Sequence, residues 1–293
     1  MTGARGLLGH ALAAHLTRSA PSPETLRLTD LEDLDVTDRR AVAQAIRDLR
    51  PRTVFHLAAW TDVDAAEAHP QEAARINVEA AEDVARAAAD AGALIVHMST
   101  DFIFDGSKEG AYEEDDPPSP LGVYARTKAE SEARVRAAAP DAHLIVRTAW
   151  LYGSGGPNFV EKILRAAERG ETLRVVSDQI GCPTWNEDLA RALVAMVEAD
   201  LRGTFHACGA GSASRWELAQ EAVRAAGLDV PVQTVTSDRL APTGRAGDPS
   251  ATGRARARRP ARVVLSAEKL ARATGFRFPD WRQSVRAYVT SRR

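Results

Sequence analysis

The sequence predicts an α/β protein with a doubly wound parallel sheet and a smaller C-terminal lobe. Through the first half of the chain, short β-branched or apolar runs alternate with Ala-, Glu- and Arg-rich helical stretches, which is the pattern of a parallel sheet covered by helices. A G-x-x-G-x-x-G run opens the chain, and its 293 residues suffice for one large α/β unit with an appended lobe. We therefore expect a first domain at residues 1–155 and, at residues 156–293, a lobe interleaved with the last strands of the sheet.

The first half contains the elements of this sheet in alternating order. Short β-branched or apolar runs predict strands at Thr25–Asp30, Thr53–Leu57, Leu94–Ser99 and His143–Thr148. Between them, apolar residues at helical spacing predict helices at Asp38–Leu49, Pro70–Ala91 and Val123–Ala138. Thr37 and Asp38 have side-chain oxygens that can cap the first of these helices.

The second half is less regular. Periodicity predicts helices at Asn158–Arg169 and Asn186–Ala199, and extended segments at Thr172–Val176 and Gly203–Cys208. A Gly-, Pro- and Arg-rich stretch, Arg239–Arg262, predicts a long loop before closing helices at Ser266–Thr274 and Trp281–Ser291.

Composition excludes several classes of function. The 38 basic and 40 acidic side chains give a formal charge of −2, so no overall field favours nucleic acid or an anionic membrane surface. No stretch approaches the roughly 18 apolar residues that span a bilayer. Cys182 and Cys208 lack C-x-x-C spacing, and the histidines show no metal-ligand spacing. We expect a cytoplasmic protein with no metal site and no nucleic-acid or membrane partner.

The glycine run predicts a dinucleotide site. Gly3, Gly6 and Gly9 would let the backbone turn tightly and approach a pyrophosphate, whose charge is met by amides at the start of the following helix. Asp30 lies 21 residues beyond Gly9, at the end of a predicted strand, where an acid can bind the ribose diol or simply form a turn. An acid there would repel a 2′-phosphate, so we expect a modest preference for NADH over NADPH, which Arg5 could weaken.

Only Met1 and Thr2 precede the first glycine, whereas this motif normally follows a strand. A typical strand has about five residues. We therefore expect that the sequence begins late and lacks the first, central strand of the sheet. The mass of the protein from its native source would test this expectation.

Two further motifs predict chemistry. Tyr124 and Lys128 lie four residues apart, on one face of a predicted helix, although any amphipathic helix can carry such a pair. A phenol has an ordinary pKa of about 10, which a neighbouring cation lowers by stabilising phenolate. Ser99, Thr100 and Asp101 end a predicted strand, at the edge where open α/β sheets bind ligands; they could also merely terminate the strand.

With these motifs the sequence resembles the extended short-chain dehydrogenase/reductase superfamily, and within it the dTDP-4-dehydrorhamnose reductase family. The resemblance runs from Gly3 to the last helix. Besides the glycines and the Tyr/Lys pair, it rests on ordered segments at Leu34–Asp38, Ala58–Asp64, Ser99–Gly106, Arg147–Gly153, Asp178–Thr184 and Arg259–Arg262. His56 stands where members often have Asn, and the loop around Arg239–Arg258 is longer than usual.

The resemblance implies a role for each matching residue. The first domain would bind NADH or NADPH and the second lobe the substrate. Tyr124 would be the proton donor, Lys128 would lower its pKa and hold the nicotinamide ribose, and Thr100 would bind the reacting oxygen. Cofactor contacts would come from Gly3, Gly6, Leu7, Leu8 and Gly9 at the pyrophosphate, Asp30 at the ribose, Asp35 and Val36 at the adenine, and Ala58, Ala59 and Trp60 in the middle. Thr100, Asp101 and Trp150 would meet the sugar, and Arg259 could bind a diphosphate.

The implied reaction is reduction of the C4 ketone of a nucleotide-linked 4-keto-6-deoxyhexose, first of all dTDP-4-dehydrorhamnose to dTDP-L-rhamnose. A sugar-nucleotide epimerase remains an alternative, because it too needs reversible hydride transfer. A related dehydratase would usually place Asp-Glu after the threonine, whereas Asp101 is followed by Phe102. A non-catalytic dinucleotide-binding subunit, such as the related regulatory subunit of methionine adenosyltransferase, is the other alternative. A homodimer is possible.

Overall fold

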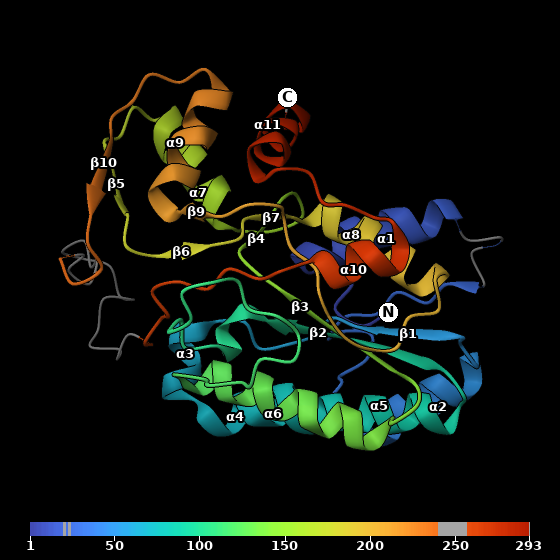
Figure 1. The fold of residues 1–293 in the computed structure, drawn as a ribbon. Helices are drawn as coiled ribbons and strands as arrows, with labels where there is room; N and C mark the ends of the chain where they lie inside the picture. The colour runs from blue at the N-terminus through green and yellow to red at the C-terminus, as the bar shows by residue number, and fades with distance from the viewer. Residues whose placement is uncertain (20–21, 23–24, 240–256, 293) are drawn as a thin grey trace.

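A parallel four-stranded sheet forms the centre of the molecule (Figure 1). The computed structural model describes residues 1–19, 22, 25–239 and 257–292. The strands are β1 (Thr53–His56), β2 (Leu94–Thr100), β3 (His143–Thr148) and β8 (Gly203–His206), in the order β1-β2-β3-β8. Each neighbouring pair is parallel. The three predicted strands at the centre of the first half are thus confirmed within about a residue or two at each end.

Helices cover both faces of this sheet, which confirms the doubly wound fold (Figure 1). One layer contains α2 (Arg39–Leu49), α5 (Ala80–Asp90) and α6 (Val123–Ala138). The other contains α1 (Leu7–Ser19), α8 (Asn186–Glu198) and α10 (Glu268–Thr274). Because both faces are covered, Leu94, Ile95 and Val96 are buried in succession rather than alternately. Asp38 caps α2 as expected, accepting hydrogen bonds from Arg40 and Ala41 amides.

The predicted helix at Pro70–Ala91 is interrupted. Its first turn is α4 (Pro70–Ala74), its last part is α5, and a π-helical turn, η2 (Arg75–Glu79), lies between them. An additional short helix, α3 (Val63–Ala68), precedes it. The π-helical turn contains Asn77, which is buried at 1% exposure.

The predicted strand at Thr25–Asp30 is wrong as a regular strand. Residues 26–30 have no assigned secondary structure. They run beside residues 1–4, where the Thr29 amide donates to the Met1 carbonyl at 2.9 Å and the Ala4 amide donates to the Thr29 carbonyl at 3.1 Å. Residues 1–4 lie between this segment and β1, because Thr2 forms a parallel bridge with His56 of β1. These few hydrogen bonds do not form a ladder long enough for a regular strand. The expectation that the first strand of the sheet is missing from the sequence stays a prediction.

The second half supplies a lobe above the sheet (Figure 1). Its helices are α7 (Phe159–Glu168), α9 (Arg215–Ala226) and α11 (Trp281–Ser291). Short pairs of strands join them: β5 (Leu173–Val176) with β10 (Val232–Val235), β4 (Leu151–Tyr152) with β7 (Thr184–Trp185), and β6 (Ile180–Gly181) with β9 (Ala213–Ser214). β8, α8 and α10 follow residue 155 in the chain but belong to the sheet and its helix layers. The division of the chain into two domains at residue 155 stays a prediction. Most of the predicted loop, residues 240–256, lies outside the described residues.

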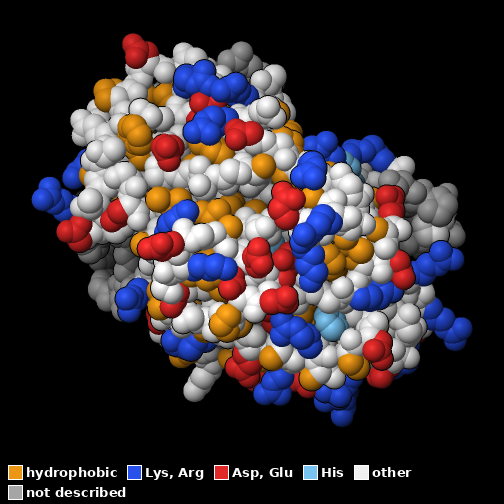
Figure 2. Space-filling view, in the orientation of Figure 1, with side chains coloured by type: hydrophobic (Ala, Val, Ile, Leu, Met, Phe, Trp, Pro, Cys, Tyr) orange, Lys and Arg blue, Asp and Glu red, His pale blue; other side chains and the backbone are white. Residues whose placement is uncertain are grey.

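The surface carries charges of both signs. On the face shown in Figure 2, basic and acidic side chains are interspersed over much of the molecule. None of the helices in the described part of the chain combines the length and the apolar composition of a membrane span.

Candidate active site

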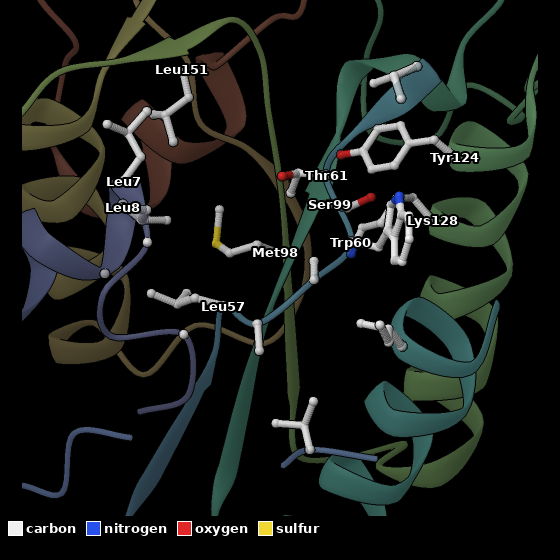
Figure 3. Close-up of a pocket in the computed structure, with 18 of the residues that line it drawn as sticks. Leu7, Leu8, Leu57, Trp60, Thr61, Met98, Ser99, Tyr124, Lys128 and Leu151 are labelled. Carbon is white, nitrogen blue, oxygen red and sulfur yellow. The ribbon is translucent and has the colours of Figure 1, made fainter. Parts of the chain in front are cut away.

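A pocket of about 1080 Å³ runs along the carboxyl ends of the central strands, between the sheet and the second lobe (Figure 3). In Figure 3, Leu7, Leu8 and Leu151 lie on one side of it, and Tyr124, Lys128 and Trp60 on the other. The structure brings nearly all predicted site residues to this pocket: Gly3, Gly6, Leu7, Leu8, Gly9, Asp30, Asp35, Val36, Ala58, Ala59, Trp60, Asp101, Tyr124, Lys128 and Trp150. Thr100 and Arg259 do not line it.

The three glycines of the loop have different physical roles. Gly3 has a φ of +67°, and a Cβ there would lie 2.7 Å from the Ala58 nitrogen. A Cβ on Gly9 would lie 2.1 Å from the Gly3 carbonyl oxygen, so both positions are required by backbone packing. A Cβ on Gly6 would meet only that same oxygen, at 3.3 Å, and would otherwise occupy the pocket. The loop and the amides at the start of α1 therefore fit a dinucleotide pyrophosphate.

Acidic side chains gather at the end of the pocket where the cofactor ribose is predicted to bind. The Asp30 carboxylate accepts hydrogen bonds from the Arg5 and Leu31 amides, each at 2.9 Å. The Arg5 guanidinium forms an ion pair with Glu32 and lies 3.7 Å from Asp33. Arg5 is thus already neutralised by neighbouring carboxylates. Next to this group, Asp35 accepts hydrogen bonds from Thr37, whose amide lowers the pKa of Asp35.

Tyr124 is buried beside Thr100 and Asp101. Burial, together with the charge of Asp101, raises the pKa of Tyr124 to about 12, although a hydrogen bond with the Thr100 hydroxyl acts in the opposite direction. Thr100 lies just behind the pocket wall and donates to Asp101 at 3.0 Å. The pKa of Tyr124 is thus raised rather than lowered, because removal of the phenol from water is the largest effect. The role of Lys128 towards Tyr124 stays a prediction.

Lys128 is buried at 3% exposure on the same helix, α6. Its Nζ lies 3.4 Å from His97 Nε2. Burial lowers the pKa of Lys128 to about 8, while the charge of Glu132 acts to raise it. His97 and the adjacent His56 are also buried, and burial lowers the pKa of each well below its ordinary value. Lys128 is thus a buried amine beside neutral histidines, with the charge of Glu132 partly offsetting the cost of burial.

Two polar residues that the sequence analysis missed hold α6 in place. The Asn77 side chain accepts from the Trp60 amide at 2.8 Å and donates to the Trp60 carbonyl at 3.1 Å and to the Thr127 hydroxyl at 3.0 Å. Glu67 accepts from the Val123 amide at 2.7 Å, at the first turn of α6. Asn77 thus connects the predicted cofactor segment to the turn of helix between Tyr124 and Lys128.

The second lobe adds Arg215, another residue that the sequence analysis missed. Its Cζ lies 3.6 Å from the centre of the Trp150 ring, and both residues line the pocket. Trp150 has a φ of +43°, which is uncommon for a residue other than glycine. The signal that could have found Arg215 is the capping box formed by Ser214 and Glu217, which marks the start of α9.

Arg259 lies away from the pocket lining. Its guanidinium donates to Asp64 at 2.8 Å and to the Ala257 carbonyl at 3.1 Å. The charge that was expected to meet a diphosphate is thus engaged by a carboxylate. In the described residues, no group of three or more His, Cys, Asp or Glu side chains could hold a metal ion.

The fold and the site define an oxidoreductase that uses a nicotinamide dinucleotide. A glycine loop opens α1, and a tyrosine and a lysine one helical turn apart face the same pocket. The chain belongs to the family described as RmlD substrate binding domain, whose model matches residues 1–293. The predicted resemblance to dTDP-4-dehydrorhamnose reductases is thereby confirmed.

Known relatives cover between 82% and 99% of this chain. A dTDP-4-dehydrorhamnose reductase of Sinorhizobium fredii is 38% identical over 99% of this chain and 95% of the relative. A dTDP-4-keto-6-deoxy-D-glucose reductase of Streptomyces niveus is 42% identical over 82% of this chain and 83% of the relative. A crystal structure of dTDP-4-dehydrorhamnose reductase from Bacillus anthracis in complex with NADP is 32% identical, with a TM-score of 0.88 and coverage of 99% of this chain and 96% of that chain.

Proposed function

We propose that the protein reduces the C4 ketone of a nucleotide-linked 4-keto-6-deoxyhexose with NADH or NADPH, first of all dTDP-4-dehydrorhamnose to dTDP-L-rhamnose. One observation carries this proposal: Tyr124 and Lys128 face the same pocket as the glycine loop, with Thr100 in hydrogen-bond contact with Tyr124. The names of the relatives support the substrate class. They favour a reductase over the epimerase and over a non-catalytic subunit.

The side chains suit reduction. When bound, a reduced nicotinamide supplies the hydride; Lys128 would hold its ribose, and the glycine loop its pyrophosphate. Tyr124, with a pKa raised to about 12, keeps its proton at neutral pH and can donate it to the C4 oxygen as negative charge develops there. Thr100 and Asp101 would orient that oxygen and the sugar, and Trp150 would close the substrate end.

Replacement of Tyr124 by Phe tests the proposal. We expect kcat for dTDP-4-keto-6-deoxyhexose reduction to fall by about 100-fold or more, because the proton donor is lost. Nicotinamide absorbance follows the reaction, and analysis of the product gives its C4 configuration. The control is Tyr152→Phe, because Tyr152 is also buried and its hydroxyl has no hydrogen-bond partner among the described residues. Unchanged turnover of Tyr124→Phe would exclude Tyr124 as the donor.

The cofactor preference follows from the acids at the ribose end. Asp30, Glu32 and Asp33 would repel a 2′-phosphate, and Arg5 is paired with two of them. We expect a modestly higher kcat/KM with NADH than with NADPH. Asp30→Ser should shift the ratio towards NADPH, whereas Asp48→Ser, on the exposed side of α2, should not. A clear NADPH preference of the unaltered protein would contradict the assignment of Asp30.

Two assignments on the surroundings of the enzyme belong with this proposal. Cys182 and Cys208 are free and buried, which supports a reducing compartment such as the cytoplasm. We also propose a homodimer, which light scattering of the purified protein would test.

A further inference from the structure

The strongest unassigned feature is the position of Arg215 in the pocket. Its guanidinium carbon lies 3.6 Å from the centre of the Trp150 ring and 5.1 Å from that of Phe159, and all three residues line the pocket. Gly181 packs behind the indole, where a Cβ would lie 2.4 Å from Trp150 Cε2. The ring is therefore fixed in place, and the guanidinium carbon of Arg215 lies against it.

Most cations of this pocket have another role. The lining contains Arg5, Arg75, Lys128 and Arg215. Arg5 pairs with Glu32, and Arg75 donates to the Thr37 hydroxyl at the adenine end. Lys128, one helical turn from Tyr124, is the residue that the proposed function places at the nicotinamide ribose. Arg215 is the lining cation on the wall that the second lobe contributes.

The N–H groups of the Arg215 guanidinium are available to bind a ligand. Within the described residues, none of its nitrogens has a hydrogen-bond or ion-pair acceptor, and Asp101 interacts with it only through charge. A second guanidinium, that of Arg259, is close enough to influence it electrostatically. The charges of Asp101 and Arg259 thus act on this guanidinium in opposite directions, and its N–H groups are left for a bound anion.

We propose that Arg215 binds the diphosphate of the nucleotide sugar, with its guanidinium held flat on Trp150 and its N–H groups donating to phosphate oxygens. This inference rests on the proposed function, because a nucleotide sugar carries the diphosphate. It assigns the phosphate contact to a residue of α9, whereas the predicted contact, Arg259, is engaged by Asp64. Planar guanidinium groups suit such recognition because they donate two parallel hydrogen bonds.

Binding of dTDP alone, measured by titration calorimetry, tests the proposal without turnover. We expect Arg215→Gln to weaken dTDP binding by about 10-fold or more, and Arg215→Lys by less. Binding of thymidine, which has no phosphate, and of NADH should stay unchanged in both variants. The control is Arg224→Gln on the same helix, because Arg224 is exposed and pairs with Glu221.

Each outcome decides the question. Loss of dTDP affinity with intact NADH binding supports the proposal for Arg215. If the unaltered protein also reduces none of the keto sugars tested, the proposed function is contradicted, but the assignment of Arg215 to the diphosphate is not. Unchanged dTDP affinity in Arg215→Gln, or equal losses for thymidine and dTDP, would overturn it. If Arg215→Gln does not fold, Arg215→Lys replaces it in the test. The proposal would then be overturned if Arg215→Lys binds dTDP with unchanged affinity and if salt does not weaken dTDP binding to the wild-type protein.

Discussion

At the scale of single residues, burial sets the protonation states in the pocket. Burial raises the pKa of Tyr124 to about 12 and that of Asp101 to about 6, and it lowers the pKa of Lys128 to about 8. In each case the environment favours the neutral form of the group. The tyrosine is thus kept as an acid, which suits reduction, while Asp101 and Lys128 titrate on either side of neutrality, at about 6 and about 8.

The pH dependence of kcat/KM follows from Lys128. Above a pH of about 8 the ammonium loses its proton, and with it the charge that we propose holds the nicotinamide ribose. We expect kcat/KM to decline as pH rises through this value. A profile that stays level up to the ordinary lysine pKa of 10.5 would contradict the assignment. Lys162→Met, on α7 outside the pocket lining, is the control for the loss of a lysine.

Sequence patterns identified the site residues whose motifs are local. The glycine loop and the pair formed by Tyr124 and Lys128 have fixed spacings, and these residues all reach the pocket. Arg215 and Asn77 were missed because their partners, Trp150 and Trp60, lie far away in the sequence. Arg259 was expected at a diphosphate, but its ion pair with Asp64 joins segments that no local pattern relates.

At the scale of elements, η2 positions α6 relative to Ala58–Trp60, the segment that is predicted to contact the cofactor. The π-helical turn places the Asn77 side chain where it can bond both the Trp60 backbone and Thr127. Periodicity predicted one continuous helix because a single wide turn leaves the apolar spacing on either side nearly unchanged. The predicted strand at Thr25–Asp30 was wrong for a different reason. A strand needs a neighbouring strand with which to form a hydrogen-bond ladder, and residue propensity alone does not show whether one is present.

Asn77→Ala tests this positioning role. We expect weaker NADH binding and a lower kcat, because Trp60 and α6 lose their connection, together with a loss of stability of about 1–3 kcal/mol. Fluorescence titration gives the affinity, and urea unfolding gives the stability. Asn158→Ala is the comparison, because Asn158 caps α7 instead. A variant of Asn77 that is less stable but binds NADH normally would show that the residue is only structural.

At the scale of the whole molecule, buried charges connect α6 to the sheet. Glu132 accepts from Arg147 of β3 at 2.9 and 2.8 Å, and both side chains are at most 2% exposed. Burial acts to raise the pKa of Glu132, but the hydrogen bonds and charge of Arg147 outweigh it, so this pKa lies below its ordinary value. The helix that carries Tyr124 and Lys128 is thus fixed to the strand that ends beside Trp150.

Glu132→Ala should be strongly destabilising, because it leaves the Arg147 charge buried without its partner. We expect a loss of about 3–5 kcal/mol in urea unfolding. The exposed Glu130→Ala, on the same helix, should change stability by no more than about 0.5 kcal/mol. Because the folded-state pKa is lowered, the contribution of Glu132 is complete above its ordinary pKa of 4.5 and is lost as pH falls through the folded value. Equal effects of the two substitutions would contradict this account.

The packing of α1 on α8 has a consequence for how the protein is made. Leu8 and Leu12 of α1 are buried with Leu189 and Leu193 of α8, and the Asn186 side chain donates to the Leu7 carbonyl at 2.7 Å. Residues 20–185 separate α1 from α8 in the chain, so the face of α1 that packs on α8 is uncovered while these residues are being made. During that interval its leucines are open to chaperones, and a nascent chain halted before α8 would be prone to aggregation.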